Sequence, residues 1–208
     1  CGKPRIKCGD CAHRQLIPVS DLVIYYHLAG THTAGMYPLL EDDSCYFLAV
    51  DFDEAEWQKD ASAFMRSCDE LGVPAALEIS RSRQGAHVWI FFASRVSARE
   101  ARRLGTAIIS YTCNRTRQLR LGSYDRLFPN QDTMPKGGFG NLIALPLQKR
   151  PRESGGSVFV DMNFQPYSDQ WAFLASVIPM NVQNIEPTIL RATGSIHPLD
   201  VNFINEED

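Results

Sequence analysis

The sequence has no run of 18 apolar residues, no signal peptide and no lipidation motif, so nothing in it is typical of a membrane-anchored chain. It also has little net charge, because 21 Lys and Arg face 24 Asp and Glu, which excludes a bulk basic surface for nucleic acid. Six cysteines in 208 residues are too few and too unevenly spread for a disulfide scaffold. We therefore expect a cytoplasmic protein. Since the chain opens at Cys1 rather than at Met, we also expect it to be part of a longer polypeptide or operon-encoded system.

The apolar content, 44% of the residues, suffices for one substantial core. Hydrophobic spacing and turn residues predict two helices, Glu54–Leu71 and Ser97–Arg117, the second opened by a capping box of Ser97 and Glu100. They also predict four strands: Cys45–Asp53, Ala75–Ser80, Ala86–Phe92 and Asn141–Leu147. The order is βαββαβ, which predicts an α+β, ferredoxin-like or RRM-like core. Both helices are then expected on one face of the sheet, with the opposite face open.

Outside this core, the pattern predicts a helix at Asp21–Leu28, a strand at Ser157–Val160 and a helix at Ser168–Val177. Residues 181–208 show weak periodicity and are expected to be irregular.

Two aspartates close the apolar run Cys45-Tyr-Phe-Leu-Ala-Val-Asp51-Phe-Asp53. Side chains alternate along a strand, so Asp51 and Asp53 are expected on one face, about 6–7 Å apart. A hard dication such as Mg²⁺ or Mn²⁺ would relieve the repulsion between them. Such a pair alone is more often a strand-end cap or a turn, but the end of a central strand favours a metal site. Asp125 is the best candidate for a third carboxylate, with Asp132 and Asp161 as fallbacks.

His87 follows the polar turn Arg81-Ser-Arg-Gln-Gly85. A lone histidine on a sheet rim is ordinarily structural. Here, however, Arg81, Ser82 and Arg83 supply two guanidinium groups and a hydroxyl, a combination that suits a polyphosphate. Gln148-Lys149-Arg150 would add donors, although a solvated charge cluster explains that segment nearly as well.

Two further sets of residues are candidates for contacts with nucleic acid or nucleotide. Tyr37 or Phe139 could stack on a base or sugar. Arginines recur along and just beyond the second core helix, and with Lys136 they would contact phosphates if DNA lay across the open sheet: Arg99, Arg102, Arg103, Arg115, Arg117 and Arg120. Such a run is ordinarily only a solvated helix face.

Three cysteines stand within the first eleven residues, as Cys1-x6-Cys8-x2-Cys11. The Cys-x-x-Cys spacing suits tetrahedral zinc, and the rival interpretation, a redox pair, lacks a βαβ context here. His27 is the expected fourth ligand, and His13 is the alternative. Cys45 is expected in the core.

Four ordered segments resemble the archaeo-eukaryotic primase superfamily: Leu-Ala-Val-Asp51-Phe-Asp53, Ser-Arg-Ser-Arg-Gln-Gly-Ala-His87-Val-Trp-Ile-Phe-Phe, Tyr-Asp125-Arg-Leu-Phe-Pro-Asn-Gln-Asp132 and Gly-Phe-Gly-Asn-Leu-Ile-Ala-Leu-Pro-Leu-Gln148. The resemblance covers the chain from the cysteines to about Trp171. It is strongest to the primase-polymerase branch of bacterial conflict systems and of CRISPR-associated loci.

The resemblance implies that Asp51, Asp53 and Asp125 bind divalent ions and that His87 contacts the phosphates of the incoming nucleotide. It also implies a zinc module at the cysteines. Gly85 stands where the second motif of the family has a serine, so a hydroxyl must come from Ser82 or be absent.

Together these observations predict a zinc-binding module and lead-in over residues 1–44, a catalytic core over 45–180 and an irregular segment over 181–208. The predicted activity is that of a DNA-directed primase-polymerase, a nucleotidyltransferase that uses nucleoside triphosphates on a single-stranded DNA template and primer by a two-metal mechanism. The alternatives are a non-catalytic RRM-like nucleic-acid-binding module and a metal-dependent nuclease.

Overall fold

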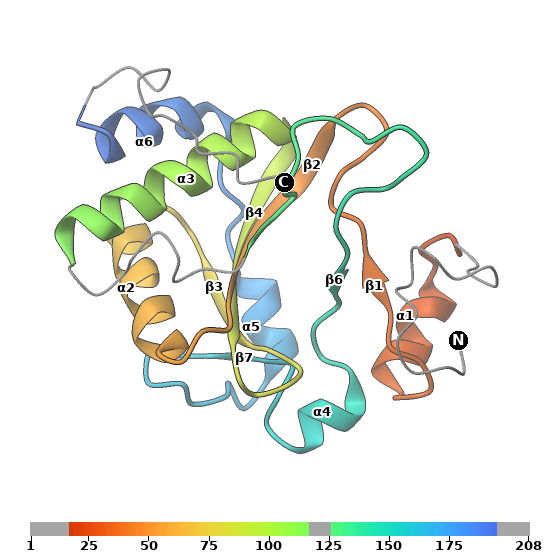
Figure 1. Ribbon diagram of the computed structural model, residues 1–208. Helices are drawn as coiled ribbons and strands as arrows, with labels where there is room; N and C mark the ends of the chain where they lie inside the picture. Colours follow the sequence, from red (N-terminus) through yellow and green to blue (C-terminus); the bar gives the residue numbers. More distant parts are fainter. Residues whose placement is uncertain (1–16, 117–125, 195–208) are drawn as a thin grey trace.

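A five-stranded antiparallel sheet forms the centre of the molecule (Figure 1). The structure is a computed structural model, and it describes residues 17–116 and 126–194. The strand order across the sheet is β5-β2-β4-β3-β7, with these bounds: β2 Ser44–Phe52, β3 Ala76–Ile79, β4 Ala86–Ser97, β5 Arg126–Phe128 and β7 Val158–Val160. Together with helices α2 (Trp57–Glu70) and α3 (Ala98–Arg115), the first four strands follow the order βαββαβ, and β7 extends the sheet beside β3. The α+β class is confirmed.

Local signals account for the helix ends that the sequence predicts. The hydroxyl of Ser97 accepts a hydrogen bond from the Glu100 backbone N–H at 3.2 Å, so Ser97 caps α3 as predicted. The Glu100 carboxylate accepts from the Ser97 hydroxyl at 2.6 Å, whereas in a full capping box it accepts from the backbone N–H of the cap residue. Helix α2 ends at Glu70, and Gly72 follows with a φ of +68°, a conformation that glycine adopts without strain. Helix α1 spans Asp21–Leu28, with Ser20 as its cap.

The main core lies on one face of the sheet. Alternate residues of β2, among them Leu48, Val50 and Phe52, are fully buried there. Figure 1 shows α2, α3 and α6 (Ile185–Ala192) on this side. The two core helices therefore share a face, as predicted.

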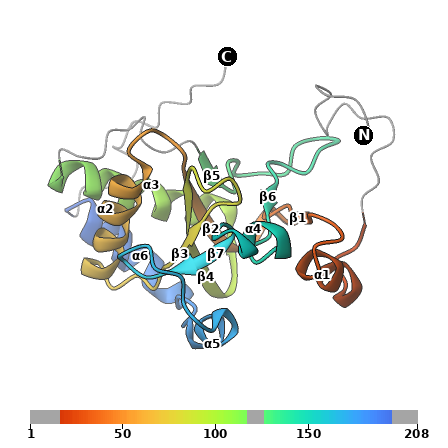
Figure 2. The same ribbon diagram turned by 90° about the horizontal axis from the view of Figure 1, so that it is seen from below.

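The opposite face is partly covered, contrary to the expectation of an open surface. Phe47, Trp89 and Phe159 form a second buried cluster there. Helix α5 (Gln170–Ser176) and residues from α1 pack against this cluster, and Figure 2 shows α1 and α5 beyond the sheet, away from α2 and α3. A mostly apolar cavity of about 280 Å³ lies between these elements. Only part of this face is accessible to a ligand, since apolar side chains from distant segments bury the rest.

The strand expected at Asn141–Leu147 is corrected by the structure. Only Ile143–Ala144 (β6) is extended, and it pairs with β1 (Gly35–Met36) in a separate two-stranded sheet. The edge position beside β2 belongs instead to β5. Pro146 lacks an N–H for a ladder, and Asn141 uses its side-chain amide to donate to the Leu127 carbonyl at 2.9 Å, so this segment supports β5 rather than replacing it.

The C-terminal segment is also more ordered than expected. A 3-10 helix, η2 (Val182–Asn184), leads into α6, whose Ile185, Ile189 and Ala192 are buried. Their spacing of four and three residues marks one face of a helix, and this face packs with α3 in the main core. The expectation of an irregular segment was therefore wrong over residues 182–192.

The ladder between β2 and β4 is interrupted at one end. Phe47 lies opposite Phe91, but Cys45 lies opposite Val96, so β4 has four residues where β2 has one. Met180 pairs with β4 in this stretch: its N–H donates to the Phe91 carbonyl at 2.7 Å, and its carbonyl accepts from the Ala93 N–H at 2.9 Å.

No helix within residues 17–116 and 126–194 combines the length and apolar character needed to cross a membrane.

Candidate active site

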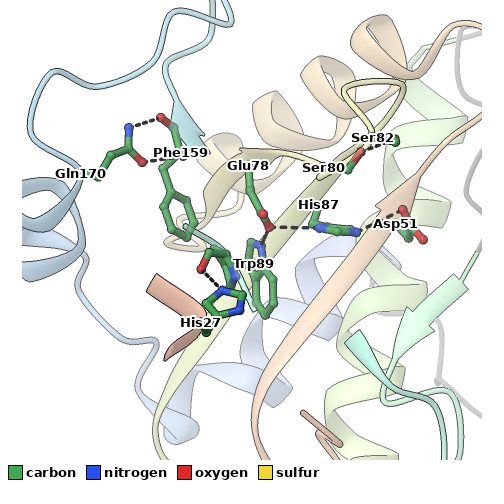
Figure 3. A network of polar contacts seen from close by, with 10 residues as sticks. His27, Asp51, Glu78, Ser80, Ser82, His87, Trp89, Phe159 and Gln170 are labelled. Carbon is green, nitrogen blue, oxygen red and sulfur yellow. Dashed lines mark hydrogen bonds and ion pairs between the residues drawn. The ribbon is translucent and has the colours of Figure 1, made fainter. Parts of the chain in front are cut away.

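A row of polar residues crosses the sheet where β2 ends and β4 begins. The strand registers place Glu78 of β3 opposite His87 of β4, His87 opposite Asp51 of β2, and Asp51 opposite Arg126 of β5. Residues directly opposite one another share a face, and here it is the face away from α2 and α3. Figure 3 shows Glu78, His87 and Asp51 pointing toward one another.

The imidazole of His87 lies between two carboxylates. Its Nδ1 is 3.0 Å from Glu78 Oε2, and its Nε2 is 3.5 Å from Asp51 Oδ1. The side chains of His87 and Asp51 are 12% and 17% exposed, whereas that of Glu78 is 2% exposed. Burial lowers the pKa of His87, but the hydrogen bond to Glu78 and the charges of Glu78, Asp51 and Asp53 together raise it above its ordinary value. The surroundings thus favour a protonated ring, which attracts phosphate.

Asp53 follows β2 directly and is exposed. Alternation along the chain assigns it to the same face as Asp51, and its charge contributes to the raised pKa of His87. Both acids of the predicted pair therefore lie close to His87. Carboxylate oxygens are the donors that Mg²⁺ and Mn²⁺ prefer, so this pair fits the expected ions.

Gly85 lies beside this acid pair, and the structure explains why it is not a serine. A Cβ at position 85 would come within 2.6 Å of the Phe52 carbonyl oxygen and within 3.3 Å of Asp53 Cα. Both neighbours are backbone atoms, so a side chain fits only if the two chain segments move apart. The glycine allows the start of β4 to approach the backbone of Asp53 closely.

Asp125, the predicted third acid, lies outside the described residues. In the sequence it directly precedes Arg126, the β5 residue opposite Asp51. The two fallback acids have other partners: Asp132 pairs with Arg102, and Asp161 accepts backbone hydrogen bonds from Asn163 and Gln165 in a turn. Among the residues that the structure describes, no group of three or more His, Cys, Asp or Glu side chains is arranged to hold a metal ion.

The turn between β3 and β4 carries the predicted phosphate-binding side chains, all of them exposed. The hydroxyl of Ser82 lies 3.0 Å from that of Ser80 and accepts from the Gln84 N–H. Arg81 donates to the Thr33 hydroxyl at 3.3 Å, and Arg83 donates to the Ser154 carbonyl at 3.1 Å. These contacts tie the turn to the segments after α1 and after α4 (Lys149–Glu153) and do not join it to the polar row.

Gln148 and Tyr37 are also held by protein contacts. The buried amide of Gln148 accepts from the Arg150 N–H at 2.9 Å and donates to the His32 carbonyl at 3.3 Å, which caps α4 and anchors it to the segment after α1. The ring of Tyr37 packs against that of Phe139, with centroids 5.2 Å apart. The two predicted stacking residues therefore contact each other.

The predicted zinc ligands Cys1, Cys8 and Cys11, and the alternative His13, lie outside the described residues. His27 is buried, with its Nε2 donating to the Pro146 carbonyl at 2.9 Å and its Nδ1 accepting from the Ala34 N–H at 3.0 Å. Both ring nitrogens are thus engaged, and a zinc ion at His27 would have to displace one of these bonds. In this arrangement His27 joins α1 to the segment after β6.

Cys45 is fully buried in the main core, as expected. Burial raises the pKa of its thiol to about 12.

The arginines of α3 do not face the polar row. Helix α3 covers the opposite face of the sheet, and three of its arginines pair with acids: Arg102 with Asp132, Arg103 with Glu186 and Arg115 with Glu70. The expectation that they contact DNA lying across the accessible face is wrong for these three.

Glu78 is the residue that sequence reasoning missed. It is a buried acid in the otherwise apolar strand Ala76-Leu-Glu78-Ile79. Its Oε2 accepts a hydrogen bond from Trp89 Nε1 at 2.7 Å as well as from His87. A lone acid inside an apolar strand was the available signal, since such a residue needs a partner when buried.

The chain was also compared with known proteins. Residues 1–188 match the model of the family described as the archaeo-eukaryotic primase domain of the TOTE conflict system. No curated protein matches the chain.

Proposed function

Because the chain belongs to the family of archaeo-eukaryotic primase domains of the TOTE conflict system, we propose that it is a DNA-directed primase-polymerase. In this proposal it joins nucleotides from nucleoside triphosphates to a primer on a single-stranded DNA template. The observation that carries the proposal is the contact of His87 with Asp51 at the end of β2. It joins the first and second motifs of the family pattern where β2 ends and β4 begins.

Asp51 and Asp53 are proposed to hold two Mg²⁺ or Mn²⁺ ions, with Asp125 completing one site. When bound, such ions lower the pKa of the attacking 3′-hydroxyl and neutralise charge on the triphosphate and on the leaving pyrophosphate.

The side chains around the acids supply binding and orientation. Nε2 of His87 is the nitrogen that faces the acid pair, and in this proposal it donates to a phosphate oxygen of the nucleotide. Arg81, Ser82 and Arg83 are proposed to extend this contact along the triphosphate from the exposed turn. Positioning and charge are most of what phosphoryl chemistry requires of a protein.

Gln148 and Tyr37, which the sequence predicts to bind the nucleotide, would act less directly. Gln148 would support the segment that carries Lys149 and Arg150, because its amide caps α4. Tyr37, packed on Phe139, would offer one aromatic edge to a base or sugar. The cysteines Cys1, Cys8 and Cys11 are proposed to bind a structural zinc ion. His13 is proposed as the fourth ligand in place of the expected His27, because both ring nitrogens of His27 are bonded to protein atoms.

The covered part of the sheet argues against the RRM-like binding alternative. Such modules stack bases on aromatic side chains exposed on the sheet. Here Phe47, Trp89 and Phe159 are buried beneath other segments, so the middle of the sheet is closed to bases. The end of β2 carries acids instead, and these would repel a nucleic-acid backbone unless cations were bound.

Primer extension with Mn²⁺ or Mg²⁺ tests the proposal. Asp51→Asn and Asp53→Asn are each expected to lower the rate of synthesis by about a hundredfold or more, the scale of loss when charge stabilisation is removed. Asp69→Asn, at an exposed acid of α2, is the matched control and should retain activity. Primer degradation would indicate a nuclease, and template binding without turnover by the wild type would indicate a binding module. Either result overturns the proposal.

A further inference from the structure

Glu78 is a buried acid whose position the packing of the core does not explain. It lies on β3, between β4 and β7, with 2% of the residue exposed. Removing a carboxylate from water is unfavourable, and an apolar side chain of similar volume is often at least as stabilising in such a place. The contacts of this acid therefore suggest a role beyond stability.

One oxygen of Glu78 binds two rings. Oε2 accepts from His87 Nδ1 at 3.0 Å and from Trp89 Nε1 at 2.7 Å. Because a carboxylate oxygen only accepts, Nδ1 of His87 must carry a proton. The Trp89 indole, held by the same oxygen, stands edge-on to the imidazole with centroids 6.0 Å apart and an interplanar angle of 84°. Figure 3 shows the three side chains in this arrangement.

This arrangement selects one of two orientations of the imidazole. A half-turn of the ring exchanges its nitrogen and carbon atoms, and the bond to Glu78 is what distinguishes the two. With Nδ1 bound to Glu78, Nε2 lies 3.5 Å from Asp51 Oδ1, on the side of the acid pair. Side chains behind histidine ligands in metal sites fix the ring in the same way.

We propose that Glu78 is a positioning residue that holds His87 with Nε2 directed at the triphosphate of the bound nucleotide. The inference rests on the proposed function, because it assigns that role to His87. Glu78 itself is buried behind His87 and acts only through the ring.

Two substitutions separate the hydrogen-bond acceptor from the rest of the side chain. Glu78→Gln keeps a carbonyl oxygen that can accept from both rings, whereas Glu78→Met keeps much of the volume but removes the acceptor. With primer extension as the assay, Glu78→Met is expected to lower kcat/KM for the nucleotide by about tenfold to a hundredfold, mainly through KM, as for a lost hydrogen bond to a charged group. Glu78→Gln keeps the ring held but removes the charge that favours its protonated form, so its kcat/KM should lie between those of Glu78→Met and wild type.

A matched control and a second measurement exclude a merely structural effect. Glu70→Met makes the same change at an exposed acid of α2, which pairs with Arg115, and should leave kcat/KM unchanged. Nitrogen NMR of labelled histidine, with the His87 signals assigned through His87→Gln, reports the hydrogen bond at Nδ1 directly. Its Nδ1 signal is expected to move in Glu78→Met and to stay close to wild type in Glu78→Gln.

The outcomes are distinct. A folded Glu78→Met protein with wild-type kcat/KM and an unmoved Nδ1 signal overturns the inference. If Glu78→Met does not fold, the glutamine variant decides: activity retained with Nδ1 still bound supports positioning, and activity lost with Nδ1 still bound overturns it. If the wild type makes no strand, the proposed function fails, and the inference fails with it even where the NMR signal shows that the ring is held.

Discussion

Replacing Gly85 with alanine perturbs the site through a single methyl group. The new Cβ would lie 2.6 Å from the Phe52 carbonyl oxygen and 3.3 Å from both Cα and Cβ of Asp53. A contact below 3.0 Å must be relieved, and a backbone oxygen in a strand cannot rotate away as a flexible side chain can. The end of β2 and the start of β4 therefore have to separate. The change acts where the acid pair and His87 are held together.

The size of the effect follows from this contact. Overpacking of this kind destabilises a protein by about 1–3 kcal/mol, which for a chain of this size lowers Tm by about 2–12 °C. The φ angle of Gly85 lies outside the left-handed region, so the loss comes from the contact and not from backbone strain. The rate of primer extension should fall by about a hundredfold, because a displacement of about 1 Å at a catalytic group has an effect of that size.

Thermal unfolding and primer extension measure the two effects separately. Gly138→Ala is the control: it is a partly buried loop glycine with a φ outside the left-handed region, and its added Cβ would meet only the Pro135 ring, at 3.1 Å, with no backbone atom nearby. Its Tm is expected within about 1 °C of wild type. A Gly85→Ala protein with wild-type Tm and activity would refute the reasoning. So would a Gly85→Ser protein that becomes more active, since the serine of the family pattern would then fit.

Two further predictions concern His27 and the free cysteines. His27→Gln should lower Tm by about 2–12 °C, because the substitution removes two buried hydrogen bonds. The zinc content of the protein, measured by mass spectrometry, should stay unchanged, since both ring nitrogens are already engaged. Loss of zinc would assign His27 as a ligand. Among the three cysteines in the described part of the chain, Cys45 and Cys68 should resist alkylation of the folded protein at about pH 8, since burial raises the pKa of both thiols. The partly exposed Cys113 should react before them. Early modification of Cys45 would contradict its burial.

Local patterns were enough to predict much of the fold. The strand that carries Asp51, the hairpin that leads into His87 and the capped helix at Ser97 each follow from residues close together in the sequence, and all three are found. Helix α6 carried the same kind of signal in Ile185, Ile189 and Ala192, but it is short and was missed.

Contacts between distant segments could not be predicted in this way. Strand β5 has three residues, too few for a periodic pattern, and its place depends on pairing with β2. The cover over Trp89 comes from α1 and α5, more than sixty residues away on either side in the sequence. In the site, the resemblance implied His87, and the lone acid in an apolar strand marked Glu78, but pairing the two required the register of the β3–β4 hairpin, which was not worked out from the sequence.

The interrupted ladder between β2 and β4 has a consequence for how the chain tolerates change in length. The unmatched residues of β4 lie between Phe91 and Val96, with the continuous pairing from Phe47 to Phe52 on one side of them. A residue added or removed in this stretch can be absorbed locally, without sliding His87 past Asp51. A one-residue insertion within Ala93–Arg95 should therefore be far less harmful than a one-residue insertion between His87 and Phe91, which would turn His87 toward the opposite face of the sheet.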